Sequence, residues 1–177
     1  GTLVTELHFV LTSFVYIPNL YSVDASLGGA VDVSGYSLLD DQGQPTLEPD
    51  GLVFDPATGL MNGMPEAKQD ETHYLLRATN AQGTSTIDLY IQVIPQDQTL
   101  TFDKLHSMVL GDPDQTLSAI ASSPWAVEFT SADPNICTVI NGAVHAVAVG
   151  TCTVTASQPG DGETYNPAIP VSRSFNI

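Results

Sequence analysis

The two cysteines, Cys137 and Cys152, are the residues whose type and spacing point most directly to a reaction, because oxidation would join them. They lie fifteen positions apart, and Cys152 alternates with Val154 and Ala156 on one inward face of an expected strand. A disulfide closing such a loop stabilises a fold by about 3 kcal/mol and belongs to an oxidising compartment. Two free thiols buried as small apolar groups are the alternative. A reactive thiolate is not expected, since only His145 is a basic residue near either cysteine.

Carboxylates form the second group of residues that could do chemistry, because their oxygen atoms are the ligands that Ca²⁺ prefers. They stand at Asp40, Asp41, Glu48, Asp50 and Asp55, and again at Asp112 and Asp114. The spacing is not that of an EF-hand loop, so solvated acidic loops are the alternative to a calcium site. The first candidates for Ca²⁺ are Asp40, Asp41, Asp50 and Asp55. Asp97, between two expected domains, is the candidate for an interdomain ion of the cadherin type.

Trp125 is the only tryptophan of the chain and lies in the proline-containing bend SSPWAVEF. An exposed tryptophan beside Tyr165 would present flat apolar rings on which a sugar ring stacks. The alternative is a partly buried residue that serves packing alone. The pair is therefore a candidate ligand contact.

Catalysis is not expected from this sequence. The four histidines, at positions 8, 73, 106 and 145, follow neither a nucleophile-elbow pattern nor the spacing of a zinc site. Carboxylate pairs for glycoside hydrolysis are easy to propose among 20 Asp and Glu residues, but small sandwich domains offer no evident cleft for a substrate.

The composition predicts a folded, all-β protein. The formal net charge of −16 disfavours nucleic acid and anionic lipid as partners. Hydrophobic residues make up 42% of the chain and charged residues 14%, which is too apolar for a disordered chain. Thr, Ser, Val, Gly and Pro are abundant, as in short strands joined by turns. No apolar run reaches the roughly eighteen residues of a membrane-spanning helix.

Two copies of one closing hairpin divide the chain. Residues 74–93 (YLLRATNAQGTSTIDLYIQV) and 152–177 (CTVTASQPGDGETYNPAIPVSRSFNI) both read as strand, turn and strand. Between them, Pro95 cannot donate to a sheet ladder and the residues after it are polar. We expect an N-terminal strand or the end of a preceding module at 1–18, one domain at 19–95, a short linker at 96–98 and a second domain at 99–177. So short a linker is expected to restrict the relative angle of the domains.

Short strands at regular spacing predict the architecture of each domain. In the second domain they are expected near 99–102, 117–121, 126–129, 137–140 and 144–149, before the closing hairpin. Seven such strands separated by turns are typical of a sandwich. The predicted fold class is therefore all-β, with two tandem immunoglobulin-like β-sandwich domains.

The string GLVFDPATGLMNGMP (51–65), followed by the hairpin from His73 onward, resembles a family of bacterial Ig-like domains, over residues 19–94. One departure is Thr72, where that family usually has a tyrosine. Residues 98–177 are similar to the Ig-like repeats of large bacterial surface and adhesin proteins. That resemblance implies a disulfide between Cys137 and Cys152, and a use as stalk, spacer or adhesive module.

Three functions follow as hypotheses. The first is a non-catalytic structural or adhesive module pair of a secreted or cell-surface bacterial protein, which spaces or presents a binding domain. The second is a module that binds a glycan or a host protein, through a patch near Trp125 or in residues 38–50. The third is an interaction subunit of an envelope or secretion assembly, in which residues 3–17 pair with a neighbouring chain. All three place the chain at the cell exterior or in the periplasm, without insertion into a membrane.

Overall fold

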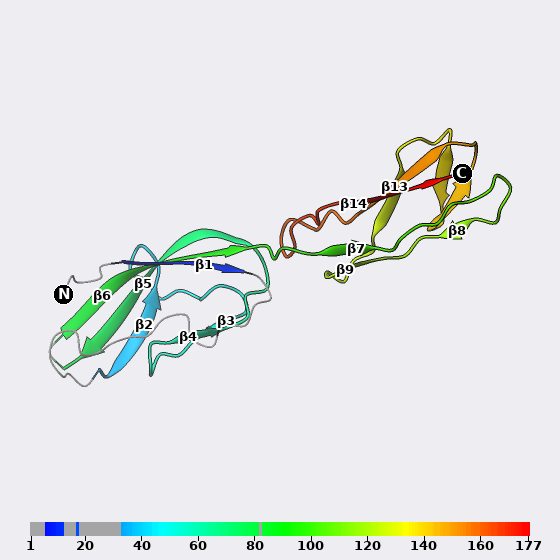
Figure 1. The fold of residues 1–177 in the computed structure, drawn as a ribbon. Coiled ribbons are helices and arrows are strands. Elements are labelled where there is room, and N and C mark those ends of the chain that lie inside the picture. Colours follow the sequence, from blue (N-terminus) through cyan, green and yellow to red (C-terminus); the bar gives the residue numbers. More distant parts are fainter. Residues whose placement is uncertain (1–5, 13–16, 18–32, 82) are drawn as a thin grey trace, which may run out of the picture. The chain divides into compact units, whose positions relative to one another are not determined.

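The structure is a computed structural model that describes residues 6–12, 17, 33–81 and 83–177 (Figure 1). Every regular element in these residues is a β-strand, so the all-β prediction is confirmed. The chain divides into two compact units, unit 1 from Gly1 to Gln96 and unit 2 from Asp97 to Ile177. This division falls between Gln96 and Asp97, inside the segment 96–98 that was expected as a linker. The described residues contain no helix long and apolar enough to cross a membrane.

Unit 1 is built on a four-stranded sheet, whose strand order is β1-β6-β5-β2 (Figure 1). The bounds are β1 Glu6–Thr12, β2 Gly35–Leu39, β5 Gln69–Asn80 and β6 Gly83–Ile94. The long strands β5 and β6 form the antiparallel hairpin that the sequence predicts. Its alternation holds, because Tyr74, Leu76, Leu89, Ile91 and Val93 all lie in the core.

Strand β1 completes this sheet at one edge. It runs parallel to β6, in a register from Glu6 opposite Asp88 to Thr12 opposite Ile94, and it places Leu11 in the core of unit 1. Residues 1–18 were expected as an N-terminal strand or as the end of a preceding module, and within them residues 6–12 supply a strand to the sheet of unit 1. Because β1 stands at the edge of the sheet, pairing of residues 3–17 with a neighbouring chain would not require β1 to leave β6, and this pairing stays a prediction.

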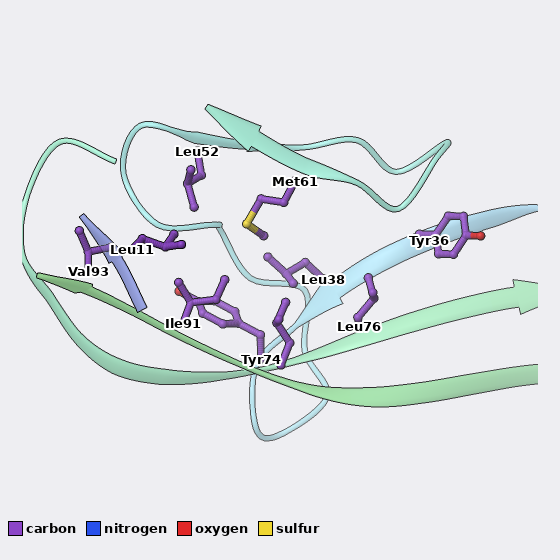
Figure 2. Packing of buried hydrophobic residues seen from close by; sticks show 10 residues of the cluster. Leu11, Tyr36, Leu38, Leu52, Met61, Tyr74, Leu76, Ile91 and Val93 are labelled. Carbon is purple, nitrogen blue, oxygen red and sulfur yellow. The ribbon is translucent and has the colours of Figure 1, made fainter. Parts of the chain in front are cut away.

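A short hairpin covers the inner face of the sheet. It consists of β3, Leu52–Phe54, and β4, Met61–Gly63, which pair antiparallel. Figure 2 shows Leu52 and Met61 pointing from this hairpin toward side chains of the sheet such as Leu38 and Tyr74. These contacts exclude water, since Met61 is fully buried and Leu52 is 4% exposed. The hairpin and the sheet thus form the two layers of a sandwich.

The turn of this hairpin explains part of the GLVFDPATGLMNGMP string. Asp55 Oδ1 accepts a hydrogen bond from Ala57 N at 2.8 Å, and Asp55 Oδ2 accepts one from the Thr58 hydroxyl at 2.7 Å. Gly59 follows with a φ of +71°, and a Cβ there would lie 2.6 Å from the ring of Tyr36. Only glycine therefore satisfies both the backbone conformation and the packing at this position.

Unit 2 contains shorter strands arranged in three small sheets, with the orders β10-β13-β14, β11-β12-β8 and β7-β9. The first sheet comprises β10 Glu128–Ser131, β13 Thr151–Ser157 and β14 Val171–Asn176. The second comprises β8 Gln115–Thr116, β11 Cys137–Ile140 and β12 Ala143–Ala146, and the third β7 Leu100–Phe102 and β9 Ala119–Ala121. Most of these strands fall where turn spacing predicts them. Strand β8 was not predicted, because its two residues follow a polar run that shows no alternation of polar and apolar residues.

The core of unit 2 lies between these sheets and contains the inward residues of the closing hairpin. Cys152, Val154 and Ala156 on β13 are each fully buried, as their alternation predicts, and so is Val144 on β12. Phe102 and Phe175 close the cluster from β7 and β14. Both units therefore have a hydrophobic core of their own.

Candidate functional site

The cysteines form a disulfide between β11 and β13, so the prediction is confirmed and the free-thiol alternative is excluded. Both Cys137 and Cys152 are fully buried among core residues of unit 2. The Ser131 hydroxyl lies 3.2 Å from Cys137 Sγ. The bond therefore joins two different sheets across the interior, where it restricts unfolding and is shielded from solvent.

Two of the carboxylates proposed for calcium hold their own turns instead. Asp40 Oδ1 accepts hydrogen bonds from Gln42 N at 2.9 Å and Gln44 N at 2.8 Å. Asp55 holds the β3–β4 turn, and the Thr58 hydroxyl and the Ala57 N–H, both donating to it, lower the pKa of its carboxyl. At Asp55 these bonds favour the ionised form of the carboxyl.

The remaining candidates do not join them in one cluster. Asp41 and Asp50 are exposed, and Asp97 Oδ1 accepts a hydrogen bond from Asn166 Nδ2 at 2.8 Å in unit 2. In the described part of the chain, no three His, Cys, Asp or Glu side chains are grouped so that they could hold a metal ion. Calcium binding stays a prediction, which calorimetric melts in calcium and in EDTA would test.

Trp125 and Tyr165 do lie together. Their ring centroids are 5.4 Å apart with an interplanar angle of 86°, which is the edge-to-face arrangement that aromatic pairs prefer. Trp125 is 38% exposed, so part of its ring faces solvent. The tryptophan is thus partly buried and in contact with Tyr165, as both the ligand contact and the packing residue require, and the ligand contact stays a prediction.

The loop that carries Tyr165 is held by Asp161. Its Oδ1 accepts hydrogen bonds from the backbone N–H groups of Glu163, Thr164 and Tyr165, and its Oδ2 accepts one from the Thr164 hydroxyl. Desolvation opposes the ionised form, but these hydrogen bonds outweigh it and hold the pKa of Asp161 well below its usual value. The ionised carboxylate therefore holds the backbone of residues 163–165, including that of Tyr165.

A buried network of polar side chains also holds this loop. Gln98 Nε2 donates to Gln158 Oε1 at 2.5 Å and to Asn166 O at 2.7 Å, while the Ser123 hydroxyl donates to Gln98 Oε1 at 2.7 Å. Gln158 Oε1 also accepts from Gly160 N. Because these buried groups satisfy one another, they stabilise the bases of both segments that carry the aromatic pair.

A second aromatic group lies on the outer face of unit 1 and escapes sequence reasoning. His8 on β1 and His73 on β5 stack on Tyr90 of β6, with centroid distances of 4.3 and 4.7 Å. His73 Nε2 lies 2.8 Å from Asp88 Oδ1, and His8 Nδ1 lies 3.6 Å from Glu71 Oε2. The sequence predicts that Tyr90 points outward, because its neighbours Leu89 and Ile91 are apolar and point inward. It does not predict that β1 and β5 pair with β6 on either side of Tyr90. The stack helps to join edge strand β1 to the sheet.

Comparison with known proteins supports the fold but does not assign the chain to a protein family. No family model matches the chain, and no curated protein sequence gives a significant match. Among solved structures, the titin domains z1z2 in complex with telethonin match at a TM-score of 0.51 and 16% identity, over 96% of this chain and 91% of that chain.

Two weaker structural matches are the EC1-2 domains of human protocadherin-24 and the four N-terminal Ig domains of Dscam1. The first has a TM-score of 0.43 and 10% identity, over 96% of this chain and 93% of that one. The second has a TM-score of 0.39 and 13% identity, over 100% of this chain and 45% of that one. Scores this low carry no argument, whereas the titin match agrees with the strand layers described above. The chain is an all-β protein with two immunoglobulin-like β-sandwich domains in tandem.

Proposed function

We propose that the chain is a non-catalytic pair of Ig-like modules that serves as a spacer or adhesive element of a secreted or surface-displayed bacterial protein. The observation that carries the proposal is two separate hydrophobic cores on either side of a short connection, since β6 ends at Ile94 and β7 begins at Leu100. The buried disulfide supports an exterior or periplasmic location, because such bonds persist in oxidising compartments. The bacterial context rests on the resemblance of residues 51–65 and 98–177.

Single-molecule stretching of the chain between its two ends tests the spacer role. Two discrete unfolding events are expected, one for each unit. The disulfide keeps the chain from Cys137 to Cys152, a separation of fifteen positions, from extending, which hides about 50 Å of length at roughly 3.4 Å per position. Reductant should restore this length in one event and leave the other unchanged. Gradual extension without discrete events would refute a spacer that resists force.

A second function, recognition of a glycan or a host protein, is supported by the partly exposed Trp125 edge-on to Tyr165. A sugar ring would stack on the free part of the indole, while the Asp161 loop holds the tyrosine in place. The test compares Trp125→Ala with Trp125→Phe on a glycan array and against candidate host proteins. Recognition at this pair predicts binding that is lost in the alanine variant and retained in part by phenylalanine. Binding that is equal in both variants, with the fold intact, would place the contact elsewhere.

A further inference from the structure

Two Asn-Gly sequences occur in the chain, Asn62-Gly63 and Asn141-Gly142, and the structure places them in different settings. Asparagine is a thermolabile residue, and it reacts most readily with the backbone that follows it when the next residue is glycine, which has no side chain to hinder the approach. The reaction yields aspartate or isoaspartate and so adds a negative charge. Because the two sequences are chemically the same, a difference in their reactivity must come from the fold.

Asn141-Gly142 forms the turn of the β11–β12 hairpin. Ile140 pairs with Ala143, which leaves Asn141 and Gly142 as a two-residue loop. Both have positive φ, +50° and +75°, as in the type I′ turn in which Asn-Gly is preferred. In the part of the chain that the structure describes, Asn141 is the only residue other than glycine with positive φ. The turn therefore holds its asparagine in a backbone conformation that most residues avoid.

This turn is accessible and lightly held. Asn141 and Gly142 are both exposed, and a Cβ built on Gly142 would meet no atom of a non-adjacent residue within 4 Å. The ladder of such a hairpin continues through Ile140 and Ala143, so the Gly142 N–H stays outside it. The Gly142 carbonyl accepts a hydrogen bond from Leu117 N at 2.8 Å, which ties the turn to the segment after β8. The two turn residues can thus rotate without opening the β11–β12 ladder.

Asn62-Gly63 has the opposite setting, inside the paired strand β4. Asn62 is half-buried, and Gly63 is paired with Leu52 of β3. The Gly63 N–H, whose nitrogen would have to react, donates a hydrogen bond to Ile17 O at 3.0 Å. Reaction at this position therefore requires the loss of strand pairing as well as a rotation of the backbone.

We propose that Asn141 is a site of spontaneous modification, which converts it to aspartate or isoaspartate through a cyclic imide formed with Gly142. The Gly142 nitrogen attacks Asn141 Cγ, a C–N bond forms, and the bond from Cγ to Nδ2 breaks. Ammonia leaves with the proton that the Gly142 nitrogen gives up. Water then opens the ring at either of its two carbonyl carbons, so the reaction needs neither an oxidant nor a reductant. Ring closure requires rotation about the Asn141 Cα–C bond, away from the turn conformation.

Isoaspartate is the product that changes the fold. It carries the main chain through the side-chain methylene, so it adds one atom to the backbone of a two-residue turn. The Gly142 carbonyl would then be displaced from Leu117 N, and the pairing of Ala143 with Thr116 of β8 would be disturbed. Modification of Asn141 therefore weakens unit 2. This inference does not depend on the spacer role or on ligand binding by the aromatic pair.

Prolonged incubation of the intact, oxidised chain at mildly alkaline pH tests the proposal. Peptide mass mapping, with fragmentation that distinguishes isoaspartate from aspartate, measures the products at both sequences. Asn141 should react at least about tenfold faster than Asn62, with both products present. In urea with reductant the two asparagines should react at nearly equal rates, because the fold no longer distinguishes them. Equal rates in the folded chain, or aspartate alone at position 141, would overturn the proposal.

Two substitutions separate the reaction from its effect on stability. Asn141→Gly accepts positive φ but has no Cγ to attack, and Asn141→Asp carries the charge on an ordinary backbone. Calorimetry of the aged wild-type chain should show a Tm of unit 2 that falls as isoaspartate accumulates, whereas aged Asn141→Gly should keep its Tm. Fresh Asn141→Asp should stay within about 4 °C of the fresh wild type. An unchanged Tm in a chain rich in isoaspartate would refute the weakening, and an equal fall in fresh Asn141→Asp would assign it to charge instead.

Discussion

Reduction of the Cys137–Cys152 bond should lower the stability of unit 2 and leave that of unit 1 unchanged. The closed loop spans fifteen positions, and the chain-entropy relation for such a loop gives about 3 kcal/mol at 25 °C. Unit 2 has 81 residues (177 − 96). For a domain of that size each kcal/mol corresponds to about 4–8 °C in Tm, so reduction should lower the Tm of unit 2 by roughly 12–24 °C.

Differential scanning calorimetry of the intact chain, oxidised and fully reduced, measures this change. Comparing the two redox forms of the same chain avoids the cavity that a Cys→Ala pair would leave in the core. Both cysteines lie in unit 2, so the transition of unit 1 is an internal control. A fall of less than about 3 °C in the Tm of unit 2 would show that the loop-entropy reasoning fails here, and an equal fall in both transitions would show that the units do not unfold independently.

Three further predictions concern single side chains. Met61→Ala should destabilise unit 1 by about 2–5 kcal/mol in urea unfolding because it empties a fully buried site, whereas Met64→Ala, at a residue 41% exposed, should change it by less than about 0.5 kcal/mol. Gly59→Ala should cost more than Gly43→Ala in the same assay, since both have positive φ but only the former meets the Tyr36 ring; equal losses would mean that backbone strain alone decides. The pKa of Asp161 is lowered in the fold, so its stabilisation is fully present above the ordinary value of 3.8 and is lost as pH falls from there through the lowered pKa. Trp125 fluorescence should report this loosening only well below pH 3.8 in the wild type, and an identical profile in Asp161→Asn would contradict it.

Local patterns in the sequence are enough to predict much of the fold. The closing hairpins are readable because alternate positions such as Leu89 and Ile91, or Cys152 and Val154, bury one face of a strand, and period-two alternation is a property of the extended backbone itself. The β3–β4 bend is readable because proline and glycine restrict or extend φ at known turn positions. The inward position of Cys152 follows from the same alternation.

Contacts between distant segments are not readable in this way. The parallel pairing of β1 with β6 joins residues about eighty positions apart, and no local signal states which edge an N-terminal strand will occupy. The stack of His8, Tyr90 and His73 depends on that pairing. Nearness in sequence can also mislead. Asp40 and Asp55 were expected to share a calcium ion, yet each accepts hydrogen bonds within its own turn.

The sequence by itself determined the all-β class, the duplicated hairpin and the inward faces of the strands, because these depend on backbone periodicity and turn chemistry within a few residues. Only the tertiary structure decided that the cysteines are joined across two sheets and that Trp125 meets Tyr165 edge-on. Those features arise where segments separated along the chain are packed against each other, and the free energy that selects one such packing comes from the whole core rather than from any local pattern.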